Sequence, residues 1–217
     1  MAFKIDKDLI TKANNSKLTR ELFRQGIELV LSADVAGMRR LLGGTPTIER
    51  VMMNLCMGKD GNTLVHRLFT GITESEAAIE MVEILTKNFS NEMLNLPNAH
   101  GMYPIHSAVE NNIGILIDYL IEKKVNLEKR TKTQHQTPAI LAAQNADIGL
   151  LQKLCLAGAD VTAVDSAGNS CEHYVIETLG EEAARQWSVL MSLQSATKSN
   201  LLLNNEEVLA RRTHRAL

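Results

Sequence analysis

Three histidines and one cysteine are the side chains of this sequence best suited to catalysis or metal binding. His66, His106 and His173 lie in similar local sequences, and Cys171 stands two residues before His173. A cysteine next to a histidine is the pair used in nucleophilic catalysis. The sequence offers no third group to orient the histidine and no donors for an oxyanion hole. We therefore interpret Cys171 as a core residue, and we predict no catalytic residues and no enzymatic activity.

Cofactor and metal chemistry have equally little support. Cys56, Cys155 and Cys171 are widely spaced, with no CxxC pair that would hold zinc, and their odd number fits a reducing compartment better than a disulfide framework. Neither of the glycine-rich phosphate-binding patterns, GxGxxG and GxxxxGK[ST], occurs in the chain. We expect no cofactor and no bound metal.

The composition narrows the function classes further. The chain has 217 residues, of which 45% are hydrophobic and 4% aromatic, so its core must be built mainly from aliphatic side chains. Its 23 basic and 25 acidic residues give a net charge of −2, and the absence of a basic surplus argues against nucleic-acid binding. Charged residues interrupt the N-terminal segment and every long apolar run, so we expect no membrane insertion and a cytoplasmic location.

A repeated segment places the histidines in a common framework. The segments GNTLVHRL, GMYPIHSA, HQTPAILA and GNSCEHYV begin at Gly61, Gly101, His135 and Gly168, which are 40, 34 and 33 residues apart. The first interval is 33 residues plus an insertion of seven. A period near 33 predicts stacked units, each of which buries its apolar face against its neighbours.

Local chemistry predicts two helices and a hairpin in each unit. Thr137 followed by Pro138 is a helix start, with a hydroxyl N-cap and a ring suited to the first helical position. The glycines before such starts, such as Gly101, fit a tight turn that needs positive φ. Gly158 follows the helix-like run LLQKLCLA at the expected left-handed C-terminal position.

These units resemble the ankyrin repeat, whose pattern is roughly D-x-x-G-x-T-P-L-H-x-A-A, then a second helix and G-A-D-V-N. The best match is QTPAILAAQNADIGLLQKLCLAGADVTAVD, residues 136–165. Departures include His135 for glycine, Ile140 for histidine, Lys124-Val125 for Gly-Ala and Leu64 for proline. In this family the histidine hydrogen-bonds across the repeat boundary, so the resemblance implies that the three histidines are structural. Equivalent positions lie on the order of 10 Å apart in stacked helical layers, too far to share one metal ion.

The predicted fold is therefore all-α: an ankyrin-repeat solenoid of about four to five helix-pair units with helical N- and C-terminal caps. We expect a helical N-terminal cap with a degenerate repeat in residues 1–57, four ankyrin repeats in 58–180, and a C-terminal capping helix and tail in 181–217. Residues 72–80 are expected to lengthen one helix-to-helix turn, and residues 89–95 the exit from that repeat.

The C-terminal cap is predicted from the sequence EEAARQWSVLMSL, residues 181–193. Its apolar spacing would turn Ala184, Trp187, Val189 and Leu190 inward. The polar run that follows, residues 194–200, is expected to be a linker.

The resemblance also implies where a partner binds, because ankyrin proteins use their hairpin tips and the exposed side of each first helix. Carried over to this chain, the predicted partner-binding residues are Lys59, Asp60, Asn62, Ala99, His100, Met102, Glu110, Asn111, Thr133, Gln134, Gln136, Gln144, Asn145, Ser166 and Asn169. This set is rich in amides and hydroxyls and has little net charge, which fits a protein or peptide partner. We therefore predict a monomeric, non-catalytic interaction module, or adaptor.

Three alternatives remain open at this point. The chain is also compatible with a microbial effector that captures a host protein in the host cytosol. A second alternative is an enzyme or regulatory subunit with its activity in the non-repeat ends, and a third is a structural role through self-association.

Overall fold

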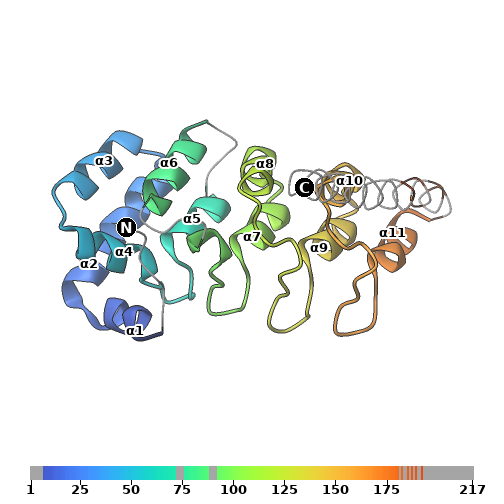
Figure 1. Ribbon diagram of the computed structural model, residues 1–217, viewed down its shortest axis with the longest axis horizontal. Coiled ribbons are helices and arrows are strands. Elements are labelled where there is room, and N and C mark those ends of the chain that lie inside the picture. Colours follow the sequence, from blue (N-terminus) through green and yellow to red (C-terminus); the bar gives the residue numbers. More distant parts are fainter. Residues whose placement is uncertain are drawn as a thin grey trace, which may run out of the picture. The chain divides into compact units, whose positions relative to one another are not determined.

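Short helices joined by loops make up the computed structural model (Figure 1), which describes residues 7–71, 76–87 and 92–180 and positions 182, 185, 187, 189 and 192. The chain divides into two compact units, the first ending at Thr133 and the second beginning at Gln134. The β-type pairing in the described ranges is a single isolated bridge between Val164 and Ser170. The all-α prediction is confirmed.

The first unit begins with four helices. They are α1 (Lys7–Asn15), α2 (Lys17–Leu31), α3 (Val35–Gly43) and α4 (Thr47–Leu55). The Ser16 side chain accepts a hydrogen bond from the Thr19 backbone and so caps α2, while Asp34 caps α3 in the same way. Helix α1 packs against both α2 and α4.

Two helix pairs complete the first unit. They are α5 (Leu64–Gly71) with α6 (Glu76–Thr86), and α7 (Pro104–Glu110) with α8 (Gly114–Glu122); a 3₁₀ turn, η1 (Met93–Asn95), lies between the pairs. The first helices α2, α5 and α7 contact one another in succession, and so do the second helices α3, α6 and α8. These two rows give the unit a two-layered, repeating architecture in which α2 and α3 take the same places as the later pairs.

The second unit contains α9 (Pro138–Gln144), α10 (Ile148–Leu156) and α11 (Cys171–Leu179). Helix α9 packs against both α10 and α11. The Thr137 hydroxyl accepts a hydrogen bond from the Ile140 backbone and Pro138 occupies the first turn, as predicted for this helix start. The same chemistry recurs at α11, where Ser170 caps the His173 backbone.

Aliphatic side chains and methionines fill the core. Met38, Met53, Met81 and Met93 are fully buried, together with many leucines, valines and alanines. An unbranched methionine adapts to irregular space between helices, so its use here compensates for the scarcity of aromatic side chains.

Several sequence-based details need correction or fall outside the described residues. Helix α6 begins at Glu76, so residues 76–80 are helix rather than turn, whereas 72–75 are not described. At the C-terminal end Trp187 is buried as expected, but Val189 is 55% exposed and does not point inward. The predictions for Ala184, Leu190 and 194–217 lie outside the described residues. None of the helices in the described ranges is both long and apolar enough to span a bilayer.

A left-handed backbone follows the second helix in both units. Gly158 has φ +96° after α10, and Lys124 has φ +54° at the equivalent position after α8. In each case the next residue, Ala159 or Val125, donates its backbone N–H to a helix carbonyl five residues earlier. The turn is therefore the same, although only one repeat supplies the glycine that tolerates this conformation without strain.

We expect Lys124→Gly to raise the free energy of unfolding by about 1 kcal/mol, because a left-handed conformation costs an L-residue roughly 1–2 kcal/mol. The reciprocal change, Gly158→Lys, should lower it by a similar amount, since a Cβ there has nothing within 4 Å and only the backbone cost remains. Urea denaturation followed by circular dichroism measures both. Two changes of the same sign would contradict this explanation.

Candidate functional site

The Asn98 side chain organises one hairpin of the first unit. Its Oδ1 accepts hydrogen bonds from the backbone N–H groups of His100 (3.0 Å) and Met102 (2.9 Å), which closes the loop over residues 98–102. Its Nδ2 donates to Asn62 Oδ1 in the preceding hairpin at 2.7 Å. Asn98 therefore fixes the shape of its own hairpin and links it to the neighbouring one.

Backbone contact then holds the two hairpins side by side. The Ala99 N–H donates to the Gly61 carbonyl at 3.1 Å. Gly61 has φ +72°, and a Cβ at this position would lie 2.0 Å from the Ala99 Cβ. Gly101 makes an equally close approach to the backbone of Lys132. Glycine is thus required here both for its conformation and for space, and the tips form a closely spaced row within the first unit (Figure 1).

His66 on α5 links this row of hairpin tips to the helices by hydrogen bonds. Its ring is buried between two partners, with Nδ1 2.8 Å from the Thr63 hydroxyl and Nε2 3.0 Å from the Met102 carbonyl. Because a carbonyl only accepts, Nε2 carries the proton and Nδ1 accepts from Thr63. Burial lowers the pKa of His66 to about 4, despite the Met102 carbonyl, which favours the charged form. The ring is therefore neutral at physiological pH and serves as a structural link between α5 and the next hairpin.

The other two histidines of the repeat differ from each other. His106 is fully buried, and its Nδ1 accepts a hydrogen bond from the Tyr103 backbone N–H at 3.3 Å. The His173 side chain is 52% exposed, with Nε2 3.7 Å from Glu177 on the same helix. The structural role predicted for this position therefore describes His66 and His106 but not His173, whose ring lies largely in solvent.

In the second unit Asp165 organises the hairpin as Asn98 does in the first. Asp165 Oδ1 accepts from the backbone N–H groups of Ala167 (2.8 Å) and Asn169 (3.0 Å), and Oδ2 accepts from the Tyr174 hydroxyl. Burial acts to raise the pKa of Asp165, but these hydrogen bonds outweigh burial and lower it. The Ser166 N–H also donates to the Gln134 carbonyl at 2.9 Å. The hairpin tip is thereby held against the loop that precedes α9.

The predicted partner-binding residues differ widely in exposure. Exposed members are Lys59, Ala99, His100, Glu110, Asn111, Thr133, Gln134, Asn145 and Ser166; partly exposed members are Asp60, Asn62, Met102, Gln144 and Asn169. Gln136 is only 3% exposed, and its Nε2 donates to Gln144 Oε1 at 2.6 Å. Gln136 must therefore be corrected from a contact residue to one that positions Gln144.

Some partly exposed members are engaged within the chain. Asp60 forms an ion pair with Arg67 at 2.7 Å and accepts a hydrogen bond from the Asn62 side chain, also at 2.7 Å. Asn169 lies 3.4 Å from the Tyr174 hydroxyl. These contacts order the tips, so the side chains with polar groups left for a partner are mainly the exposed ones.

Comparison with known proteins identifies this architecture. The family model described as ankyrin repeats, in three copies, matches residues 72–165, which include α6 to α10 and the hairpins between them. The protein contains ankyrin repeats. Similar curated proteins are the neurogenic locus notch homolog protein 1 of Xenopus tropicalis, Homo sapiens and Xenopus laevis, with 30%, 28% and 30% identity. Each alignment covers 149 residues, 69% of this chain but only 5% of the relative.

The ankyrin fold also explains the cysteines and histidines that the sequence offered as candidates for catalysis or metal binding. Cys56, Cys155 and Cys171 are all buried, and burial raises the pKa of the Cys56 thiol, which keeps it in the unreactive protonated form. Within the described ranges, no three histidine, cysteine or acidic side chains lie close enough to hold a metal ion. Ankyrin repeats are protein-interaction modules, typically without catalytic activity.

The residues that hold this ankyrin surface together were not among those predicted from the sequence. Asn98 and Asp165 occupy the same position of their repeats, three residues before Gly101 and Gly168. A short polar side chain before a turn glycine is a recognisable signal for a loop closed by side chain-to-backbone hydrogen bonds. Arg67 carried no such signal, because its pairing with Asp60 depends on how the hairpin folds back over α5.

Proposed function

We propose that this chain is a non-catalytic adaptor that binds a protein partner through its hairpin tips and the adjoining face of its first helices. The observation that carries the proposal is the row of tips in the first unit, fixed to one another by the contacts of Gly61 and Asn98. A surface that is already ordered loses little conformational freedom on binding, which favours affinity.

The chemistry of the exposed tips supports a polar protein partner. Thr133, Gln134, Asn145 and Ser166 offer amides and hydroxyls, while the exposed charges Lys59 and Glu110 are opposite in sign. The net charge is −2 and the exposed tips carry charges of both signs, so we propose a protein rather than nucleic acid as the ligand. We propose that the chain works as a monomer.

The test is affinity capture with a double variant of the tips. We expect the wild-type chain to retain a stoichiometric protein partner, and His100→Ala combined with Gln134→Ala to weaken its binding at least tenfold. Two central contacts worth about 1 kcal/mol each account for that loss. Isothermal titration with the recovered partner gives the affinities.

The matched control places the same kind of change on the second helices. Gln152 on α10 and Glu122 on α8 are exposed, and alanine at both removes polar groups from helices outside the proposed surface. This control should bind the partner like the wild type. Equal loss in both double variants would show that the hairpin tips are not the binding surface.

A further inference from the structure

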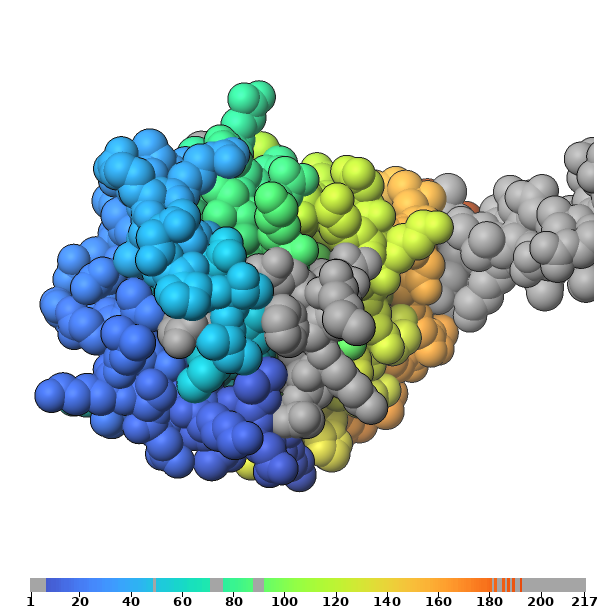
Figure 2. All heavy atoms as spheres, turned by 60° about the vertical axis from the view of Figure 1, so that its left-hand side comes forward, coloured from blue at the N-terminus to red at the C-terminus, as the bar shows by residue number. Residues whose placement is uncertain are grey.

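A pocket lies between α3, α4 and α6 of the first unit, among helices outside the proposed partner surface. Figure 2 turns this end of the molecule toward the viewer, so that α3, α4 and α6 come forward. The pocket has a volume of about 230 Å³ and is lined by Arg39, Leu42, Gly43, Arg50, Asn54, Ile84 and Lys87. Its size is below the usual range for drug-sized ligands, about 300–1,000 Å³, and suits a group no larger than an amino acid.

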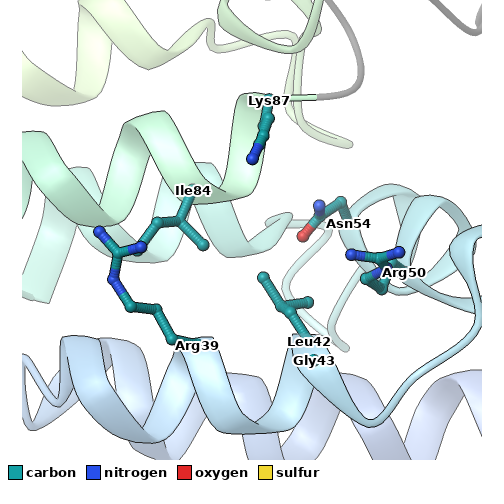
Figure 3. Close-up of a pocket in the computed structure, with 7 residues that line it drawn as sticks. All are labelled: Arg39, Leu42, Gly43, Arg50, Asn54, Ile84 and Lys87. Carbon is teal, nitrogen blue, oxygen red and sulfur yellow. The ribbon is translucent and has the colours of Figure 1, made fainter. Parts of the chain in front are cut away.

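The most informative side chain in this pocket is Asn54. It is only 2% exposed, and its Nδ2 donates to the Leu85 carbonyl at 2.8 Å, which fixes the orientation of the amide. Its Oδ1 is buried and has no hydrogen-bond partner among the described residues. Figure 3 shows this oxygen turned toward the pocket. A buried acceptor without a partner is costly, so the pocket is suited to a ligand that brings a hydrogen-bond donor.

Positive charge surrounds this acceptor. Arg39 is neutralised by an ion pair with Glu80, but in the described part of the chain Arg50 and Lys87 form no ion pair. Arg50 donates to the Thr47 hydroxyl at 3.0 Å, and its buried Nε has no acceptor among the described groups. Lys87 points toward the pocket from the end of α6 (Figure 3). Two cationic side chains facing a small pocket favour an anionic group.

The rest of the lining is apolar. Leu42 on α3 and Ile84 on α6 present aliphatic side chains beside the polar groups, as Figure 3 shows. A complete ligand for this pocket therefore combines three features: an anionic head for Arg50 and Lys87, a donor for Asn54 and a short aliphatic part. Inorganic phosphate has an anionic head and an O–H donor but no aliphatic part.

We propose that this pocket binds a carboxylate that carries a hydrogen-bond donor on its α-carbon and an aliphatic side chain. The carboxylate accepts from Arg50 and Lys87, the α-substituent donates to Asn54 Oδ1, and the aliphatic part lies against Leu42 and Ile84. Two sources share this chemistry: a free 2-hydroxy acid, and the C-terminal residue of a peptide, whose N–H is the donor.

Nuclear magnetic resonance titration of the full chain tests the ligand chemistry with four probes. N-acetyl-leucine represents the peptide terminus and 2-hydroxyisocaproate the free acid, whereas N-acetyl-leucine amide lacks the charge and inorganic phosphate lacks the aliphatic part. We expect saturable shifts of the Asn54 side-chain amide with the first two, and binding at least tenfold weaker for the others. Whichever of the first two binds more tightly identifies the source.

Charge reversal at an exposed position tests the site. We expect Lys87→Glu to weaken the tighter probe about tenfold or more, because it replaces an attractive charge by a repulsive one. Lys17→Glu changes the net charge equally at an exposed position at the start of α2, and should leave binding unchanged. Arg50→Gln provides a second variant whose polar side chain is compatible with its half-buried position. Equal binding of N-acetyl-leucine and its amide, or equal weakening by Lys87→Glu and Lys17→Glu, would overturn the proposal.

Discussion

Gly61→Ala is expected to lower the free energy of unfolding by about 3 kcal/mol or more, which is large against the usual total of 5–15 kcal/mol. One part of the cost is the backbone, because φ at Gly61 is +72° and a left-handed conformation costs an L-residue roughly 1–2 kcal/mol. The other part is packing, since the new Cβ would lie 2.0 Å from the Ala99 Cβ and 2.8 Å from the Ala99 backbone nitrogen. Backbone cannot rotate away as a flexible side chain does, so the two hairpins must separate.

The second unit supplies the control for this prediction. Gly168 stands at the same position of its repeat with φ +84°, but a Cβ there has nothing within 4 Å. Gly168→Ala should therefore show only the conformational cost, about 1 kcal/mol. Gly101→Ala should resemble Gly61→Ala, because its Cβ would lie 2.4 Å from the Lys132 Cβ. Guanidinium denaturation of the three variants measures the costs, and equal losses would show that hairpin packing plays no part.

These comparisons also show which features of the fold are encoded locally. The helix start at Thr137 and the turns at Gly61 and Gly158 each depend on one or two residues whose conformational preferences are strong. The period near 33 residues then predicts that these elements form repeats, and this prediction needs no information on long-range contacts. This is why sequence analysis predicted the helix pairs and the ankyrin family while the individual repeats depart from the family pattern.

Features that depend on what packs nearby were not predictable in the same way. Gln136 was assigned to the surface by its repeat position, yet Gln144, eight residues later, fixes its amide in a buried place. His173 shares its sequence context with His66, but its ring lies mostly in solvent. The position of a residue in a repeat determines its backbone conformation. The exposure of its side chain depends on neighbouring residues that cannot be identified from the local sequence.

The pocket of the first unit is the clearest case of this limit. Arg39 lies on α3, Arg50 on α4 and Lys87 directly after α6, so no spacing in the sequence brings them together. Asn54 lies within the helical segment TIERVMMNL, which carries no sign that one amide oxygen is left without a partner. Only the packing of α3, α4 and α6 reveals that these groups face one space.

The second large effect is expected at His66. His66→Ala should lower the free energy of unfolding by about 3–4 kcal/mol at pH 7, because it removes two hydrogen bonds and leaves both the Thr63 hydroxyl and the Met102 carbonyl without this partner. Chemical denaturation followed by circular dichroism measures the change. His173→Ala is the matched control, since it deletes the same side chain at the same repeat position from an exposed site. Its cost should stay within about 0.5 kcal/mol.

Lowering the pH should reduce the difference in the free energy of unfolding between the wild type and His66→Ala. The pKa of His66 is about 4 in the folded chain, against an ordinary value of 6.5, so between these values the unfolded chain binds the additional proton. The stability that the neutral ring contributes is therefore complete above pH 6.5 and is lost as the pH falls toward 4. At pH 4.5 the wild type should have lost about 2–3 kcal/mol from this group alone, since each unit of pKa shift corresponds to about 1.4 kcal/mol. The variant lacks that loss, so at pH 4.5 its free energy of unfolding should be only about 1 kcal/mol below that of the wild type.

A difference in the free energy of unfolding that stays constant between pH 7 and pH 4.5 would contradict this prediction. It would mean that His66 accepts a proton without breaking its link to Met102, and the neutral ring would then not be what holds α5 to the next hairpin.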